Sequence, residues 1–327
     1  MSIEINLKSA KSFARIGPRA TYGAAMYSAI KNEQDYLLLS ADLGKASGLD
    51  RLSKEFPEKF INCGIAEQSM VAFAAGLARE GFTVFASSFA PFLSMRASEH
   101  VRMNLGYMEE PVTLVALGSG LSLGYLGNSH FGIEDVSVMR SIPNMTILCP
   151  ADAGSIPKFI QACATYQKPV YLRLTGAVGS QISYLEDYSL EIGKINLAYS
   201  TGDEIAIIAS GSSVGQSIKA AEELKNIFGI TVFDCHTIKP IDEDKIVEIL
   251  NGFENIISVE EHTIIGGLSS SISEIKSNRN LPGKLHALGI LDEWVETGDY
   301  EYMLKMQKLD YNSIIKKIKS IKGVIND

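Results

Sequence analysis

Residues 61–96, INCGIAEQSMVAFAAGLAREGFTVFASSFAPFLSMR, predict one repeat of a layered α/β fold. A tight turn at residues 64–68 leads into a helix, in which apolar side chains recur at helical spacing over residues 70–78. The helix ends at a break at residues 79–81, and residues 82–85 form a strand that continues into small residues. This pattern places Glu67 at a helix N-terminus, within one of the least charged stretches of the chain.

Two interpretations of Glu67 follow from this position. In the simpler one, the carboxylate complements the helix dipole, which contributes only about 0.3–1 kcal/mol. In the other, it belongs to a binding site, because the next strand runs into Ala86-Ser87-Ser88-Phe89-Ala90-Pro91-Phe92, where aromatic residues follow small ones. Ligands of open α/β sheets bind at the carboxyl ends of the strands.

The composition is that of a globular protein with two domains. The chain has 327 residues, of which 46% are hydrophobic and 21% charged, so it can form more than one sizeable core. Its formal net charge of −8 provides no basic surface for nucleic acid, and no basic helix adjoins an apolar face. Nucleic acid and membrane surfaces are therefore not expected partners.

The sequence predicts a cytoplasmic protein. It has no run of about 18 apolar residues, and its first residues do not resemble a signal segment. The four cysteines are scattered without a CxxC pair, which favours free thiols in a reducing compartment over disulfides or a metal site.

Strands and helices alternate along two separate parts of the chain. After a loosely held lead-in over residues 1–16, the first series covers residues 17–176, and its nearly continuous apolar strands indicate a parallel sheet with helices on both faces. Residues 177–203 are expected to form a polar linker. The second series covers residues 204–327, so we expect two doubly wound domains, the second one smaller.

Several motifs in register resemble the C-terminal half of transketolase. They are GIAEQ, SSFAPFL, GNSHFGIEDVSVMRSIPNMTILCPAD, FDCHTIKPID and VEEHTIIGGL, and the resemblance extends from about Arg19 to the C-terminus. It is specific for the thiamine-diphosphate enzymes of the transketolase, deoxyxylulose-phosphate synthase and 2-oxo-acid dehydrogenase group. It implies a pyrimidine-binding domain followed by a transketolase C-terminal domain, as in the β-type subunit of a split transketolase.

The resemblance implies a cofactor site for thiamine diphosphate. Glu67 would hydrogen-bond N1′ of the aminopyrimidine and share a proton with it, and Phe89, Phe92 and Ile65 would contact the cofactor. The alternative for the two phenylalanines is an ordinary core pair at an i,i+3 interval. His130, which follows a glycine-rich loop, would contact the substrate as a hydrogen-bond donor or proton carrier. Among the other histidines, His100 is expected to be structural or interfacial, and His236 and His262 are expected to be structural.

Three positions depart from the pattern of the sugar-phosphate enzymes. Transketolases carry a histidine and an aspartate in the loop before His130, where this chain has Gly118 and Leu126, and Gly176 replaces an arginine for the substrate phosphate. Losing such a bidentate contact costs roughly 1.5–3 kcal/mol. We therefore expect a non-standard sugar, either non-phosphorylated or with its charge elsewhere, as in a nucleotide-linked sugar.

A second subunit is implied by what the sequence lacks. The family holds the cofactor's diphosphate and Mg²⁺ with a Gly-Asp-Gly stretch, which does not occur here, so no metal ligands are expected in this chain. A partner resembling the N-terminal half of transketolase would supply them, in an assembly of two copies of each chain, α2β2.

The resulting prediction is a subunit of a transketolase-like transferase that moves a two-carbon ketol unit between a ketose and an aldose. One alternative is a decarboxylating enzyme, either deoxyxylulose-phosphate synthase-like or the β subunit of a 2-oxo-acid dehydrogenase. Another is a non-catalytic partner subunit, although such a subunit would not need Glu67 beside two phenylalanines. A nicotinamide-dependent dehydrogenase is disfavoured, since no GxGxxG follows the first strand.

Overall fold

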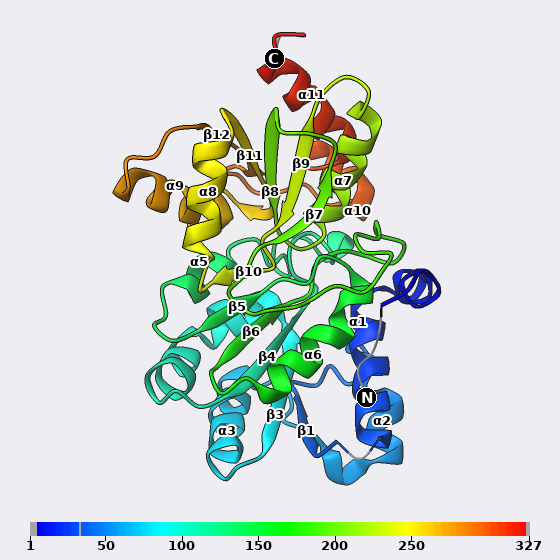
Figure 1. Ribbon diagram of the computed structural model, residues 1–327. Coiled ribbons are helices and arrows are strands. Elements are labelled where there is room, and N and C mark those ends of the chain that lie inside the picture. Colours follow the sequence, from blue (N-terminus) through cyan, green and yellow to red (C-terminus); the bar gives the residue numbers. More distant parts are fainter. Residues whose placement is uncertain (1–4, 33, 325–327) are drawn as a thin grey trace.

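The computed structural model describes residues 5–32 and 34–324, which form two sheets with helices packed on both (Figure 1). The larger sheet has seven strands in the order β10-β5-β6-β4-β3-β1-β2, all parallel except the edge strand β10. Its strands are β1 (Tyr36–Ser40), β2 (Phe60–Asn62), β3 (Thr83–Phe89), β4 (Val112–Leu117), β5 (Thr146–Leu148), β6 (Val170–Arg173) and β10 (Thr237–Lys239).

Residues 5–176 are called the first region, and its helices connect these strands. They are α1 (Leu7–Lys31), α2 (Asp50–Glu55), α3 (Glu67–Arg79), α4 (Ser98–His100), α5 (Asp135–Arg140) and α6 (Ile156–Thr165). The expectation of a loose lead-in over residues 1–16 is wrong for residues 7–16, which belong to α1; residues 1–4 lie outside the described part. A capping box between Asn6 and Ser9 starts this helix, and burial of Ala10 holds it against the domain.

The segment after β3 is wound more widely than an α-helix. Two π-helical stretches, η2 (Phe92–Arg96) and η3 (Val101–Tyr107), flank the short α4. Such π-helical turns are rare in proteins, and those that do occur are often found at functional sites.

The smaller sheet has five strands in the order β12-β11-β8-β9-β7, parallel except for β7. Its strands are β7 (Asn196–Ser200), β8 (Ile205–Ala209), β9 (Ile230–Asp234), β11 (Asn255–Thr263) and β12 (Lys284–Ile290), and its helices are α7 (Ser213–Leu224), α8 (Glu243–Gly252), α9 (Leu268–Asn278), α10 (Tyr300–Met306) and α11 (Tyr311–Ile321). Strand β7 lies within residues 177–203, for which only a polar linker was expected.

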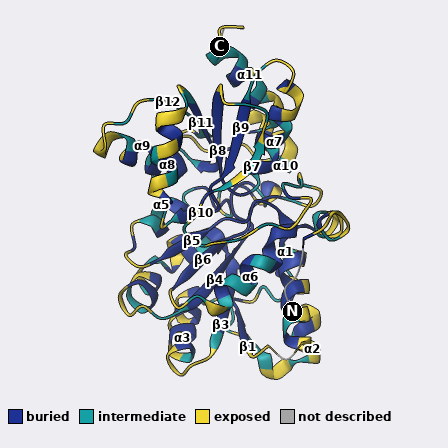
Figure 2. Cartoon of the chain, viewed as in Figure 1, coloured by how far each residue is buried: buried dark blue, intermediate teal, exposed yellow. Residues whose placement is uncertain are grey.

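Burial explains why these sequences form parallel strands. Strands β1, β4 and β8 are buried at every position, as expected for sheets covered on both faces (Figure 2). The second region, residues 177–324, forms the smaller sheet. It is joined to the first region by β10, which follows β9 and pairs antiparallel with β5 of the larger sheet. The predicted fold class, α/β with two sheets dominated by parallel strands, is confirmed. Within the described residues, no helix combines the length and the apolar character needed to cross a bilayer.

Candidate active site

Glu67 is a buried carboxylate at the start of α3. Only 1% of the residue is exposed, and the two carboxylate oxygens have different partners. The Ser88 hydroxyl donates to Oε1 at 2.9 Å, and Nη1 of Arg96 donates to Oε2 at 2.8 Å. The carboxyl group is therefore held in place by a neutral donor from β3 and a cation from η2.

Three rings lie together near this carboxylate. Phe89, at the end of β3, and Phe92, at the start of η2, are edge-to-face with ring centroids 6.0 Å apart. The His130 ring meets both, with centroids 5.7 Å from Phe89 and 5.3 Å from Phe92. The Arg96 guanidinium that pairs with Glu67 lies over the Phe92 ring, 4.1 Å from its centroid.

The structure thus brings four of the five predicted site residues into one group. Ile65 differs, because it lies in the turn before α3 and is 76% exposed. The sequence interpretation missed Arg96 and Ser88. Arg96 follows Phe92 by four residues, which at helical spacing would have placed the cation near that ring.

His130 ends a loop that begins at the carboxyl end of β4. Its backbone N–H donates to the Gly127 carbonyl at 2.9 Å, and its Nδ1 is 2.9 Å from the Ser129 hydroxyl. The ring is half-buried, so it can exchange a hydrogen bond or a proton with a ligand while its position is fixed.

A cavity of about 790 Å³ opens at the same edge of the sheet. Residues after β1, β4 and β6 line it, including Gly118 and Gly176, two of the positions at which the sequence departs from the sugar-phosphate pattern. Two cations, Arg19 and Lys45, also line it. Within the part of the chain that the structure describes, neither side chain has a hydrogen-bond or ion-pair partner. Two carboxylates, Asp42 and Asp299, line it as well, so the cavity presents both cations and carboxylates to a ligand.

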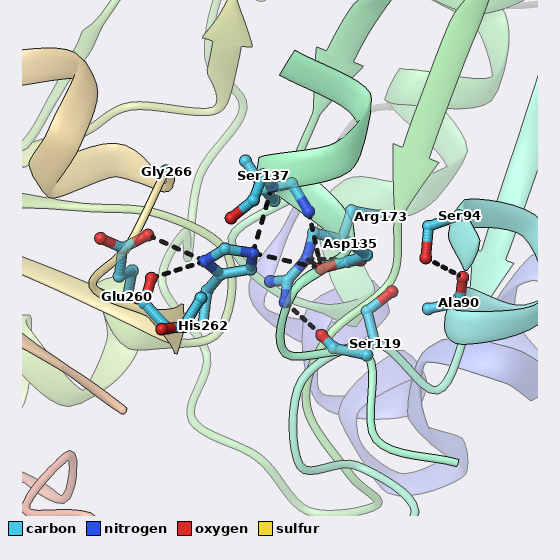
Figure 3. A network of polar contacts seen from close by, with 12 residues as sticks. Ala90, Ser94, Ser119, Asp135, Ser137, Arg173, Glu260, His262 and Gly266 are labelled. Carbon is cyan, nitrogen blue, oxygen red and sulfur yellow. Dashed lines mark hydrogen bonds and ion pairs between the residues drawn. The ribbon is translucent and has the colours of Figure 1, made fainter. Parts of the chain in front are cut away.

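A buried polar network lies between this site and the second region (Figure 3). Arg173, at the end of β6, donates through Nε to both carboxylate oxygens of Asp135 at 3.0 and 2.9 Å. Its Nη2 donates to the carbonyls of Gly132 and Glu261, both at 2.8 Å. His262 of β11 completes the contact, with Nε2 3.8 Å from Asp135.

Burial shifts the pKa values of His262 and of its neighbour Glu260 away from those of free side chains. It lowers the pKa of His262 to about 4, so the imidazole is neutral near pH 7. Burial also raises the pKa of Glu260 to about 7, although the N–H groups of Ser269 and Leu268 at the start of α9 oppose the shift. His262 therefore has the contacts of a structural residue.

The fold and site together define a two-sheet α/β protein with a buried carboxylate and three rings at the carboxyl edge of its larger sheet. Comparison with known proteins identifies the family. The family model of the transketolase pyrimidine binding domain matches residues 15–177, and that of the transketolase C-terminal domain matches residues 193–314. The chain belongs to the transketolase family.

Its relatives include separate subunits of comparable length. A Methanocaldococcus jannaschii protein provisionally named as a transketolase C-terminal section is 38% identical, over 92% of this chain and 95% of that protein. A subunit of the apulose-4-phosphate transketolase of Actinobacillus succinogenes is 35% identical, over 88% and 93%. A 6-deoxy-6-sulfo-D-fructose transketolase subunit of a Clostridium species is 31% identical, over 91% and 92%.

A solved structure gives the same assignment. The protein described as a split gene transketolase, inactive beta4 tetramer, superimposes with a TM-score of 0.81 at 31% identity, covering 94% of this chain and 98% of that chain. The chain is thus a subunit of a transketolase-type transferase, which transfers a two-carbon ketol unit between sugars. Membership of this family implies dependence on thiamine diphosphate.

The residues present fit the pyrimidine end of that cofactor. An aminopyrimidine is flat and carries a ring nitrogen that can share a proton with a carboxylate. The buried carboxylate of Glu67 and the aromatic faces of Phe89 and Phe92 have the matching chemistry.

Proposed function

We propose that this chain is the pyrimidine-binding, catalytic half of a two-subunit thiamine-diphosphate ketol transferase. The observation that carries the proposal is the buried Glu67 carboxylate, held by Ser88 and Arg96 next to the rings of Phe89, Phe92 and His130. A scaffold subunit would gain nothing from a buried carboxylate beside aromatic rings, since burying a charge costs free energy.

Each residue has a stated task in this proposal. Thiamine diphosphate, when bound, supplies the carbon nucleophile that carries the ketol unit. Glu67 holds a proton at N1′ of the aminopyrimidine, and Arg96 and Ser88 keep the carboxylate in place. Phe89 and Phe92 pack on the pyrimidine ring and exclude water, Ile65 contacts the cofactor from its exposed turn, and His130 donates a hydrogen bond or a proton to the substrate oxygen.

A second subunit completes the site in this proposal. It resembles the N-terminal half of transketolase and supplies the ligands of Mg²⁺ and the contacts of the diphosphate. The names of two similar proteins, one a transketolase subunit and the other a split gene transketolase, support such a partner. The simplest closed assembly is α2β2, with the cofactor between unlike chains. The four cysteines, all free, suit a reducing cytoplasm as the site of action.

The substrate in this proposal is a non-standard sugar that carries a negative charge. Gly118 and Gly176 remove side chains that ordinary transketolases use, whereas Arg19 and Lys45 line the cavity without partners among the described residues. The names of two relatives refer to a phosphorylated and a sulfonated sugar, apulose 4-phosphate and 6-deoxy-6-sulfofructose. We propose a substrate of this anionic class, with its charge reached by Arg19 and Lys45.

Calorimetric titration of thiamine diphosphate with Mg²⁺ tests the proposal. The titration is made into this chain alone and into its mixture with the proposed diphosphate-binding subunit. We expect binding only in the mixture, abolished by Phe92→Ala. We also expect ketol transfer by the mixture, lowered at least about 100-fold by Glu67→Gln, since positioned proton transfer contributes that much. Glu99→Gln, an exposed carboxylate in the next helix, is the matched control.

Three results would contradict the proposal. Tight binding by this chain alone would mean that the diphosphate site had been misidentified. Unchanged transfer in Glu67→Gln would support a non-catalytic subunit. Release of CO2 from pyruvate without ketol transfer would place the complex among the decarboxylating enzymes.

A further inference from the structure

The loop that carries His130 is anchored at its base by the first region. Gly120 and Gly132 exchange backbone hydrogen bonds at 2.8 and 3.2 Å, and the Ser119 N–H donates to the carbonyl of Leu174 at 3.1 Å. The loop between them rises from the sheet, and His130 lies just before its return. These contacts fix where the loop starts and ends, but they do not fix its distal part.

Contacts from the second region hold that distal part. The Asn128 amide donates through Nδ2 to the carbonyl of Val295 at 2.9 Å and accepts from the N–H of Val295 at 3.1 Å. Val295 lies between β12 and α10, 167 residues further along the chain, and is itself buried. A pair of opposed hydrogen bonds fixes both the position and the orientation of the amide. Asn128 is two residues from His130.

A second anchor lies on the other arm of the loop. The Glu261 carboxylate accepts from the N–H of Leu121 through Oε1 at 2.6 Å, and its Oε2 accepts from the hydroxyls of Ser212 and Tyr300 at 2.6 and 2.5 Å. Through these three donors, the Glu261 carboxylate joins the loop to the N-terminal ends of α7 and α10. Gly120 leaves the space for this carboxylate, since a Cβ there would lie 2.3 Å from Oε1.

The glycines of the loop show how closely the two regions approach. A Cβ at Gly124 would lie 2.2 Å from the Gly298 carbonyl oxygen, and one at Gly127 would lie 2.8 Å from the Thr297 side chain. Gly127 also has a φ of 74°, which side chains disfavour. The loop can pack on residues 295–298 only because these positions lack side chains.

We propose that Asn128 is a positioning residue, through which the second region fixes His130 against Phe89 and Phe92. The inference rests on the proposed role of His130 in the transfer reaction. It assigns the second region a part in the reaction although it supplies none of the proposed site residues: it holds the loop by a paired backbone contact and by the Glu261 carboxylate. Without the paired contact, the His130 ring loses its fixed contact with the two phenylalanines.

The geometry can be tested without a partner or a substrate. The chain has five histidines, so selective ¹³C labelling of the imidazole Cε1 gives few NMR signals, and His130→Gln identifies that of His130. Ring currents from Phe89 and Phe92 displace this signal from its position in the unfolded chain. We expect Asn128→Ala to move it toward the unfolded position and to leave the His236 and His262 signals in place.

Two further variants make this test specific. Asn251→Ala removes an exposed asparagine on α8 whose side chain, among the described residues, bonds only its own helix, and it should leave the His130 signal unchanged. Asn128→Asp keeps the acceptor for the Val295 N–H but loses the donor, so the signal should move in the same direction as in Asn128→Ala. An unmoved His130 signal in both Asn128 variants, with the fold intact, would overturn the inference.

Turnover of the reconstituted complex tests whether Asn128 acts through His130. A misplaced catalytic group can cost about 10- to 100-fold in rate, so we expect Asn128→Ala to lower kcat by that factor. In a His130→Ala background the same change should have no further effect, whereas a merely structural role would lower kcat equally in both backgrounds. Equal effects would overturn the inference. A displaced His130 signal with unchanged kcat would leave the positioning intact and refute the catalytic role of His130.

Discussion

At the residue scale, the proposed role of Arg19 and Lys45 in substrate choice can be measured. If they bind the charged end of the sugar, Arg19→Gln removes a charge-assisted contact worth about 1.5–3 kcal/mol. We expect KM for a phosphorylated or sulfonated ketose to rise at least about 10-fold, with a smaller rise in Lys45→Ala because Lys45 is exposed. Steady-state kinetics of the reconstituted complex measure both.

The comparison that makes this result specific is an uncharged ketose, for which neither variant should change KM. Arg15→Gln is the matched control, because Arg15 is exposed in α1 just before the kink at Gly17 and does not line the cavity. An equal rise in KM for charged and uncharged sugars would rule out recognition of the anion.

The sequence predicts individual residues where a motif and a strand end coincide. Glu67, Phe89, Phe92 and His130 follow from their places at strand ends and from aligned motifs, and the structure brings their side chains together. Arg96 and Ser88 could not be found in this way, because their contacts with Glu67 depend on how β3 and the π-helical turn η2 pack on α3. Such contacts are set by tertiary packing, which local patterns do not encode.

At the scale of elements, apolar strands were predictable and short or irregular elements were not. The continuous apolar runs of β1, β4 and β8 identify them as strands, since both faces of each strand are covered. Strand β10 has three residues and pairs with β5, which comes much earlier in the chain, with Thr237 opposite Leu148. No periodicity could indicate that partner. The π-helical winding of η2 and η3 likewise depends on packing and not on an apolar period.

The ion pair between β6 and α5 supports a second prediction. Arg173 is 1% exposed and is the buried partner of Asp135, so Arg173→Met leaves an uncompensated buried carboxylate. We expect a loss of about 3–5 kcal/mol in the free energy of unfolding, measured by urea denaturation. Arg279→Met, which breaks the exposed pair with Glu243, should cost about 1 kcal/mol or less. Equal losses in the two variants would contradict a structural role for the buried pair.

At the scale of the whole molecule, four buried titratable groups of the second region make stability depend on pH. Burial raises the pKa of Asp234 from 3.8 to about 8, where Tyr184 donates to one oxygen and Asp152 adds a repulsive charge, and it raises the pKa of Glu260 from 4.5 to about 7. Burial lowers the pKa of His236 and His262 from 6.5 to about 4. Between about pH 4.5 and 6.5 the folded protein therefore keeps these two carboxyl groups protonated and these two imidazoles neutral.

The two sets of groups act in opposite directions below pH 6.5. Between about pH 4.5 and 6.5 the folded state binds more protons at Asp234 and Glu260, which lowers stability as pH rises, while the unfolded state binds more at the two histidines, which raises it. These contributions largely cancel. Above pH 6.5 the histidines no longer contribute, so the carboxyl groups alone make stability fall until about pH 8.

We therefore expect these four groups together to leave the free energy of unfolding nearly unchanged from pH 5 to 6.5 and to lower it above pH 6.5, by about 1.4 kcal/mol per pH unit for each extra proton held. Urea denaturation across this range measures the curve. Asp234→Asn keeps the shape of the protonated carboxyl but cannot ionise, so its curve should flatten between about pH 7 and 8, where Glu260 has largely titrated. Asp203→Asn, at an exposed position, should leave the slope unchanged. If Asp234→Asn follows the parent curve, Asp234 is ionised in the folded protein, and its Oδ1, which has no partner among the described residues, must then bind a cation or water.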